Sequence, residues 1–226
     1  MGSWEIARVT GTPGQLHERP LEPLRRRATR CDPTAAAVVL GSTQPADTID
    51  PATADRLGLA VVRRRSGGGA VIVRPGRLLW VDVCLPSGDP VWHDDVGRSF
   101  EWLGDVWAGA LTSLGAPRPA VHRGGARRSS LARVLCFAGT GAGEVSCAGR
   151  KVVGLAQRRV RSGARFHCAV LLEWDATEAA SLVAGTNRRE AERELQGWSA
   201  GLGDLVDDRS ALADRLWAAF VERLPR

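Results

Sequence analysis

Lys151 is the one lysine in a 226-residue chain with 31 basic side chains, the other 30 being arginine. A composition this biased toward arginine suggests that lysine is kept where arginine cannot replace it. An ammonium group is a compact point charge whose pKa can be adjusted, whereas guanidinium is planar and effectively never deprotonates. Lys151 is therefore a candidate for contact with an acyl carbonyl or a phosphate, with survival by chance as the alternative.

The segment around this lysine has the pattern of a strand that could contact a ligand. Residues 149–157 read Gly-Arg-Lys-Val-Val-Gly-Leu-Ala-Gln, so that Lys151 opens the strand and Gly154 interrupts it. A glycine inside a strand often marks a place where a ligand lies against the backbone.

A second glycine segment lies about 80 residues upstream. Residues 63–71 read Arg-Arg-Arg-Ser-Gly-Gly-Gly-Ala-Val and follow a predicted strand. Consecutive glycines let main-chain N–H groups approach a ligand, and the arginines can balance a phosphate or a carboxylate. The segment is neither G-x-x-x-x-G-K-[ST] nor G-x-G-x-x-G, so the familiar nucleotide motifs are absent. A hairpin tip is the alternative interpretation.

Composition limits the remaining function classes. With 44% hydrophobic and 25% charged residues and no apolar run of membrane-spanning length, we expect a soluble cytoplasmic protein with no membrane partner. Five cysteines without C-x-x-C spacing indicate neither a disulfide framework nor a metal site. The net charge is +6, with arginine clusters near residues 25–30, 63–65 and 158–161, but no tyrosine is present to stack on bases. A solvated basic face is the first expectation for these clusters, followed by contact with acidic protein partners or substrate phosphates. We expect no nucleic acid.

Hydrophobic periodicity predicts the elements that would position these residues. Helices are expected at 51–57, 96–114, 177–184 and 204–224, with a broken helix within 15–30. Strands are expected at 36–40, 59–63, 78–85, 131–137 and 166–172, with a hairpin formed by 144–147 and 151–157. Strands grouped in the middle of the chain favour an α+β fold, with a mixed, largely antiparallel central sheet covered by helices. A parallel doubly wound sheet is the weaker alternative.

The chain resembles the lipoate-protein ligase and octanoyltransferase group of the biotin/lipoate protein ligase superfamily. The resemblance rests on three segments that occur in the same order as in that group: residues 63–71, residues 149–157 and the strand at 166–170. The resemblance is strongest over 35–185 and implies one catalytic domain over 1–226, with the acyl chain in a tunnel beside the glycine segment. It implies that Lys151 contacts the reacting carbonyl. The substrate-binding residues that it implies are Arg64, Ser66, Gly67, Gly68, Gly69, Ala70, Gly154, Gln157 and His167.

The chain departs from that family in two places. Residues 72–74 read Ile-Val-Arg where many ligases carry a His-Asp pair, and residues 166–168 read Phe-His-Cys in place of a His-His-Gly-like segment. Cys136, 15 residues before Lys151, resembles the thiol of cysteine-dependent octanoyltransferases, which takes the acyl group as a thioester. A thiolate is a good nucleophile for this step. The alternative is that Cys136 ends a buried strand; the other four cysteines are expected to pack.

Three functions follow from this resemblance. The first is a cysteine-dependent transferase that needs no cofactor and moves an octanoyl or lipoyl group from acyl carrier protein or a lipoyl domain to an acceptor lysine. Acceptors would be lipoyl domains of E2 subunits or the glycine cleavage H protein. The second is a lipoate-protein ligase that uses ATP and Mg²⁺ to form an acyl-adenylate. The third is a non-catalytic protein that binds lipoate or lipoyl domains.

Overall fold

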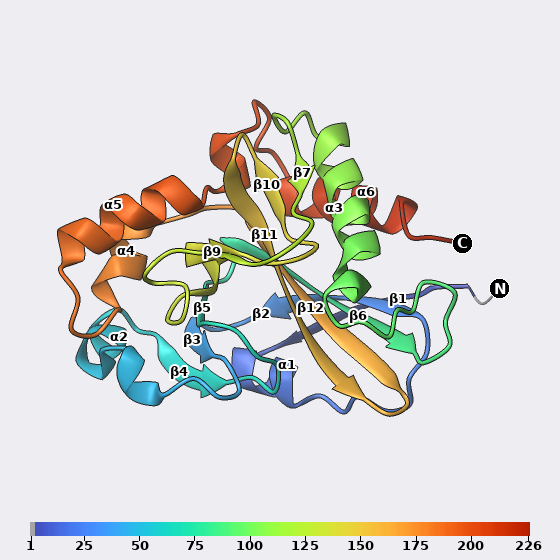
Figure 1. Ribbon diagram of the computed structural model, residues 1–226, viewed down its shortest axis with the longest axis horizontal. Coiled ribbons are helices and arrows are strands. Elements are labelled where there is room, and N and C mark those ends of the chain that lie inside the picture. The colour runs from blue at the N-terminus through green and yellow to red at the C-terminus, as the bar shows by residue number, and fades with distance from the viewer. Residues whose placement is uncertain (1–2) are drawn as a thin grey trace.

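The structure is a computed structural model that describes residues 3–226 (Figure 1). Its centre is a mixed sheet of seven strands in which β1 and β2 are parallel and the other pairs antiparallel. In spatial order these strands are β1 (Glu5–Gly11), β2 (Arg27–Pro33), β6 (Leu78–Pro86), β12 (Gly163–Leu171), β11 (Arg150–Val160), β10 (Val145–Cys147) and β7 (Ala120–Val121).

Two smaller sheets accompany the central one. The first consists of β4 (Ala60–Arg63), β3 (Ala37–Leu40) and β5 (Val71–Val73), and the second pairs β8 (Arg127–Arg128) with β9 (Gly139–Thr140). The predicted α+β class with a largely antiparallel sheet is confirmed.

Helices cover these sheets in two groups (Figure 1). Helices α3 (Glu101–Ser113) and α6 (Leu212–Glu222) pack in the main core, where the rings of Trp107 and Phe220 stack with centroids 4.2 Å apart. Helices α4 (Ala176–Ser181) and α5 (Arg188–Trp198) pack around a second core with β3. Short helices α1 (Pro13–Glu18) and α2 (Pro51–Arg56) and the 3₁₀ turns η1 (Ala46–Thr48), η2 (Arg98–Phe100), η3 (Cys136–Ala138) and η4 (Leu202–Asp204) complete the fold.

The hairpin that carries Lys151 forms as predicted. Strands β10 and β11 are joined by Ala148 (φ 47°) and Gly149 (φ 80°). Positive φ at both central residues is the requirement of the tight turn whose twist matches two antiparallel strands. Lys151 is thereby fixed one residue into β11, next to the turn.

Strand β6 differs from its prediction in burial. Its alternating pattern predicts one face on the core, yet eight of its nine residues are buried. Because β6 lies between β2 and β12 and is covered on both faces, its polar side chains also enter the interior. Asp82, only 1% exposed, is one of them.

The predicted strand at 131–137 is wrong. The segment is a series of turns ending in η3, and its apolar side chains Leu131 and Leu135 pack in the second core. An isolated bridge joins Leu135 to Ala70, and the N–H of Cys136 donates to the carbonyl of Ala70 at 2.9 Å. Apolar residues in this run were therefore a sign of burial rather than of extended backbone.

The ends of the chain also differ from the predictions. The helix expected within 15–30 ends at Glu18, because Pro20 and Pro23 follow, and the chain returns as β2. The helix expected from residue 204 begins only at Leu212. Strand β1 and the largely polar α5 were not predicted. In the helix expected at 96–114, Val96 is 55% exposed and regular α-helix begins at Glu101.

Candidate active site

Lys151 lies in a buried cage of oxygen atoms. Its Nζ is 2.6 Å from Glu144 Oε2, and it donates to the carbonyl oxygens of Cys136 at 2.8 Å and Gly139 at 3.0 Å. The ring of Phe137 lies 5.0 Å away at its centroid. An ammonium has three donors, so these three oxygen atoms match its capacity.

Charge balance keeps this lysine protonated. Burial alone would lower the pKa of Lys151, but Cys136 and Glu144 beside it outweigh this effect and raise its pKa above the ordinary value. Lys151 is therefore a fixed positive charge, not a base.

Cys136 is the sulfur nearest to this charge. Its Sγ lies 3.9 Å from Lys151 Nζ and its side chain is partly exposed at the start of η3. The predicted partnership is thus brought together in space. The other four cysteines, Cys31, Cys84, Cys147 and Cys168, are buried, as expected. Burial raises the pKa of Cys147 to about 11 and raises those of Cys31 and Cys168, which leaves them as thiols.

Two hollows meet at Cys136. One is a narrow pocket between the central sheet and β3–β5, lined mainly by apolar side chains that include Val39, Val71 and Trp80. The other is an open polar cleft that reaches Lys151 and Glu144. Cys136, Leu155 and Ala156 border both. The sulfur therefore stands where an apolar chain in the pocket and a polar group in the cleft would adjoin.

The polar cleft has a basic rim. Arg127, Arg128 and Arg133 line it, and none of them forms an ion pair with a described residue in 3–226. None of these arginines belongs to the clusters noted in the sequence. Members of those clusters instead serve the fold, since Arg26 pairs with Asp89 at 2.6 Å and Arg64 binds backbone carbonyls. Arg26 and Arg64 are buried, so not every member of these clusters lies on the expected solvated basic face.

The triple-glycine segment and Arg64 just before it contribute to both hollows. Gly67, Gly68 and Gly69 line the cleft, and Arg64 lines the apolar pocket while donating to the carbonyls of Val39, Gly67 and Gly69 at 2.7–3.0 Å. Arg64 therefore shapes the segment from within. Ser66 is buried with no hydrogen-bond partner for its Oγ among the described residues, and Ala70 holds the Cys136 backbone.

Gly154 and His167 line the apolar pocket, whereas Gln157 does not. A Cβ on Gly154 would stand 3.1 Å from Phe137 Cζ and 3.5 Å from Cys136 Sγ, so glycine keeps the space beside the sulfur open. His167 Nδ1 lies 2.7 Å from Asp82 Oδ1. Gln157 donates instead to Val96 O and Ser99 Oγ, both at 3.0 Å, and so fastens the segment before α3.

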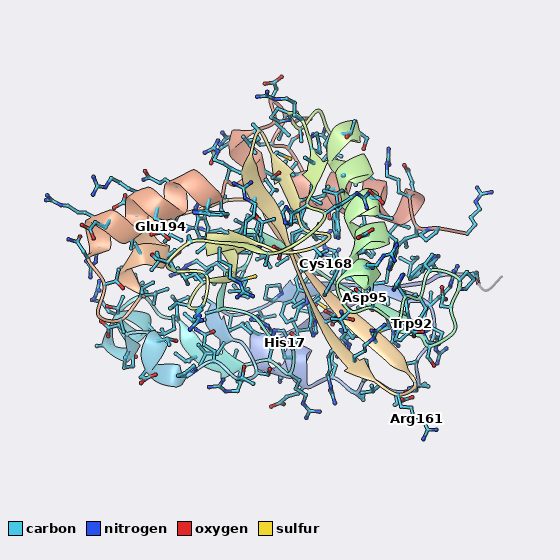
Figure 2. The ribbon with its side chains drawn as sticks, in the orientation of Figure 1. His17, Trp92, Asp95, Arg161, Cys168 and Glu194 are labelled. Carbon is cyan, nitrogen blue, oxygen red and sulfur yellow. The ribbon has the colours of Figure 1, made fainter. Side chains whose placement is uncertain are left out.

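Sequence reasoning missed Glu144, Asp82 and His17. Glu144 was interpreted only as the start of a hairpin strand, although a carboxylate seven residues before a lone lysine is a signal of an ion pair across that hairpin. Asp82 stands between Val81 and Val83 in a strand, where a charge needs a buried partner. His17, on α1, carried no recognisable signal; Figure 2 labels it and Cys168.

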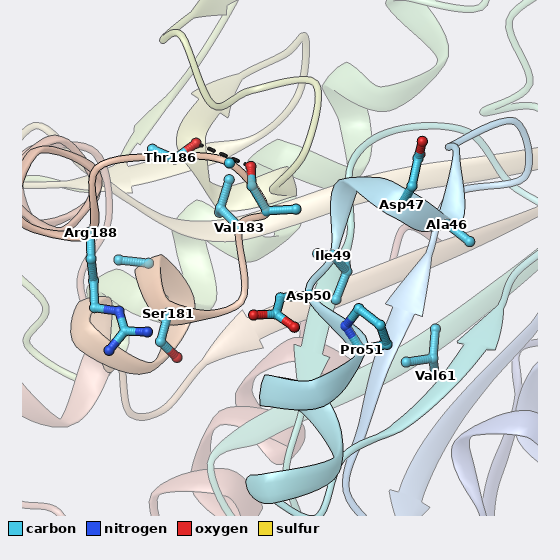
Figure 3. Close-up of a pocket in the computed structure, with 13 residues that line it drawn as sticks. Ala46, Asp47, Ile49, Asp50, Pro51, Val61, Ser181, Val183, Thr186 and Arg188 are labelled. Carbon is cyan, nitrogen blue, oxygen red and sulfur yellow. Dashed lines mark hydrogen bonds between the residues drawn. The ribbon is translucent and has the colours of Figure 1, made fainter.

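A further pocket lies away from this site, between η1, the start of α2 and the loop after α4 (Figure 3). Of its two carboxylates, Asp47 and Asp50, the second caps α2 by accepting from the N–H groups of Ala52 and Thr53 at 3.0 and 3.2 Å. The lining of this pocket contains neither a cysteine nor a lysine, so it lacks the pair of groups found around Lys151.

The described residues, 3–226, lack two further features. No group of three or more His, Cys, Asp or Glu side chains is placed to hold a metal ion. Within the same residues, no helix combines the length and apolarity needed to cross a membrane.

Comparisons with known proteins identify the family and the fold of this chain. The family model of the lipoyl protein ligase A/B catalytic domain matches residues 28–209. No curated protein matches the sequence. Among solved structures, a bipartite lipoate protein ligase from Thermoplasma acidophilum, studied with its E2 lipoyl domain, superposes with a TM-score of 0.73 at 19% identity, covering 97% of this chain and 83% of that one.

Two further structures are similar. A protein from Thermoplasma acidophilum, provisionally assigned as a lipoate protein ligase and solved with lipoic acid, gives a TM-score of 0.72 at 18% identity over 98% of this chain and 86% of its own. A lipoate-protein ligase A with bound ATP gives 0.69 at 18% identity over 97% and 85%. At these identities the likeness establishes the fold.

Proposed function

This chain belongs to the lipoyl protein ligase A/B catalytic domain family, and on that premise we propose that it is an octanoyl or lipoyl transferase acting through a thioester on Cys136. The observation that carries this proposal is the 3.9 Å separation of Cys136 Sγ and Lys151 Nζ at the junction of the apolar pocket and the polar cleft. A ligase that forms an acyl-adenylate has no need of a thiol at this point.

In the first half-reaction the thiolate of Cys136 attacks the carbonyl carbon of a carrier thioester. The new carbon–sulfur bond forms as the carbonyl oxygen becomes an oxyanion, and collapse expels the carrier thiolate, which takes up a proton. The ammonium of Lys151 offsets the negative charge that develops on oxygen. Since its three donors are already engaged, the oxyanion shares or replaces the carbonyl of Cys136 or Gly139.

In the second half-reaction a neutral lysine amine of the acceptor attacks the Cys136 thioester. An amide bond forms, the amine gives up a proton, and the carbon–sulfur bond breaks to return the Cys136 thiolate. The acyl chain stays in the apolar pocket throughout, while donor and acceptor exchange in the open cleft. The pocket therefore holds the acyl chain, and the cleft admits the partner protein.

The partners in this proposal are acyl carrier protein or a lipoyl domain as donor, and lipoyl domains of E2 subunits or the glycine cleavage H protein as acceptor. The arginines at the cleft, Arg127, Arg128 and Arg133, would attract acidic partner surfaces and speed their association. All five cysteines are free, which fits a reducing compartment such as the cytoplasm.

An ATP-dependent lipoate-protein ligase is the second candidate, favoured by the same three arginines. Unpaired guanidinium groups around a polar cleft suit phosphates, and Lys151 could hold the acyl oxygen of an adenylate. Mg²⁺ keeps several waters and binds through one or two carboxylates plus phosphates. Glu144 is the one carboxylate lining this cleft in the described chain, and it is paired with Lys151. Any Mg²⁺ here would therefore be held largely by the nucleotide.

Intact-mass analysis after mixing the protein with octanoyl-acyl carrier protein, without ATP, separates these functions. The transferase predicts an octanoyl adduct that hydroxylamine removes and that is absent from Cys136→Ser. Release of AMP from ATP and lipoate, with no adduct, would establish the ligase instead. Lipoate binding with neither product would indicate a non-catalytic binding protein.

A further inference from the structure

The apolar pocket is bordered by two histidines at a distance from Cys136. Cys136 Sγ lies against Gly154 of β11, which pairs with Ala169, whereas His167 pairs with Ala156 two residues further along. Two residues along a strand and one strand across place the Cα atoms of Gly154 and His167 about 8 Å apart. His17 lies beside His167, with ring centroids 5.1 Å apart, and both line the pocket.

His17 is a buried polar side chain whose Nδ1 has no hydrogen-bond partner among the described residues. It is only 9% exposed, and its ring lies 4.3 Å from that of Trp80. Burial lowers its pKa to about 3, so it is a neutral imidazole with one donor and one acceptor nitrogen. An unpartnered buried nitrogen destabilises a protein, so a ligand group is the natural partner.

His167 is oriented by its own buried partner. Asp82 accepts from Trp80 Nε1 at 2.8 Å and lies 2.7 Å from His167 Nδ1. Interactions with His167 and Arg165 outweigh the effect of burial and lower the pKa of Asp82 to about 2, so the carboxylate is ionised and Nδ1 carries the proton toward it. The remaining ring nitrogen, Nε2, is left for the pocket, where it accepts from a hydroxyl when the ring is neutral and donates to a carboxylate when the ring is protonated.

A third polar group has spare capacity at the pocket. Arg64 lines it, and although its terminal nitrogens bind backbone carbonyls, its Nε is buried without a partner among the described residues. Arg64 and Arg165 are both close enough to His17 to lower its pKa by repulsion. The pocket wall therefore offers hydrogen-bond donors and acceptors in a positive environment to a polar group that reaches it.

We propose that the pocket accepts a medium-chain acyl group whose far end carries oxygen, as a hydroxyl or a carboxylate, bound by His17 and His167. This rests on the proposed function, because the chain must begin at the Cys136 sulfur. An extended alkyl chain advances about 1.25 Å per bond, so the 8 Å estimate places the oxygen roughly six to eight carbons from the thioester carbonyl. A plain methyl terminus would leave the His17 nitrogen unpartnered, and dithiolane sulfur accepts hydrogen bonds only weakly.

The test compares acyl-enzyme formation from four pantetheine thioesters: octanoyl, lipoyl, 8-hydroxyoctanoyl and the half-thioester of octanedioic acid. We expect kcat/KM to be at least about tenfold higher for one or both oxygen-bearing chains than for octanoyl. Comparison of the 8-hydroxyoctanoyl and octanedioic thioesters shows whether the pocket prefers a hydroxyl or a carboxylate. His17→Phe should bring the ratio to octanoyl close to one, and His17→Gln should retain part of it. Val73→Ala, which alters the same pocket without a polar atom, should change all four by the same factor.

Equal or higher rates for octanoyl or lipoyl in the unmodified enzyme would overturn the inference while leaving the transferase intact. If no thioester forms an adduct, the transferase proposal fails, and calorimetric titration of the Cys136→Ser protein with free 8-hydroxyoctanoate, octanedioate and octanoate still decides the inference. Weaker or equal binding of both oxygen-bearing acids would then refute it. Thermal melting of His17→Phe at or above the unmodified value shows that the variant is folded.

Discussion

Glu144 Oε2 lies 2.6 Å from Lys151 Nζ, and both side chains are shielded from solvent. Glu144 also accepts from the N–H of Gly141 at 2.7 Å and from that of Leu155 at 3.0 Å. One carboxylate thus joins the glycine-rich loop after η3 to β11 and to the lysine that they enclose. Lys151 is placed by this contact as much as by its own strand.

Replacing Glu144 by Gln should therefore reduce both stability and activity. The amide can keep one backbone hydrogen bond but leaves the Lys151 ammonium without its counter-charge, and breaking a buried ion pair costs about 3 kcal/mol or more. We expect a loss of this size in urea unfolding, with acyl transfer reduced about tenfold or more. Glu101→Gln, which breaks a partly exposed pair with Arg123, should cost less than about 1 kcal/mol. Equal effects of both variants would contradict the assigned role.

Lys151→Arg should abolish acyl transfer although it keeps the charge. The Lys151 cage presents three oxygen atoms at 2.6–3.0 Å to one nitrogen, and a planar guanidinium cannot reproduce that arrangement in a buried site. We expect a fall of at least about a hundredfold in kcat/KM, which corresponds to about 2.7 kcal/mol of transition-state stabilisation. Retention of normal turnover by this variant would remove Lys151 from the mechanism. Circular dichroism is the control for folding.

The sequence predicted those parts of the site that depend on unusual residue types. A single lysine among arginines, three successive glycines and a glycine within a strand each have a physical meaning that is independent of the rest of the fold. Elements with clear periodicity, such as β6 and the β10–β11 hairpin, were also predicted, because a local pattern defines a strand without knowledge of the rest of the fold.

The features that the sequence could not predict depend on contacts between segments that are far apart in the chain. Residues 131–137 have strand-like composition, but their backbone is held by a single bridge to Ala70 and by turns. Gln157 belongs to the Lys151 motif but is engaged by Val96 and Ser99. His17 reaches the pocket only because α1 packs near β2 and β4, a contact between elements that local pattern does not contain.

Selective alkylation should identify Cys136 as the reactive thiol. It is partly exposed beside the Lys151 ammonium, whereas Cys31, Cys84, Cys147 and Cys168 are buried. We expect iodoacetamide at neutral pH to modify one site in the native protein, mapped to Cys136 by peptide mass spectrometry, and all five cysteines after unfolding. Preincubation with an octanoyl thioester should protect that site. Native labelling at Cys147 or Cys168 would refute the assignment.

The acid stability of the protein should depend on His17. Its folded pKa is about 3, lowered mainly by burial, against an ordinary value of 6.5, so between these values the unfolded chain binds the extra proton. The free energy of unfolding should therefore fall as the pH drops below 6.5, with His17 contributing about 1.4 kcal/mol per pH unit. His17→Phe lacks this contribution, and urea unfolding at pH 7, 6, 5 and 4 should show its advantage growing with acidity. Parallel curves would mean that His17 is not buried neutral.

The two glycines at either end of the triple-glycine segment should respond differently to the same substitution. A Cβ on Gly69 would stand 2.8 Å from the carbonyl carbon of Leu135 and 2.9 Å from the backbone nitrogen of Cys136, so Gly69→Ala must displace the start of η3, which carries the Cys136 sulfur. A Cβ on Gly67 would meet nothing within 4 Å. Because a displacement of about 1 Å at a reacting centre can cost a hundredfold in rate, we expect Gly69→Ala to reduce acyl-enzyme formation by that order and Gly67→Ala to have a far smaller effect. Rapid-quench measurement of the acyl-enzyme, with thermal melting of both variants, distinguishes a misplaced thiol from a destabilised fold. An equal loss of rate in both variants would show that backbone entropy, rather than contact with Cys136, explains why glycine is present at these positions.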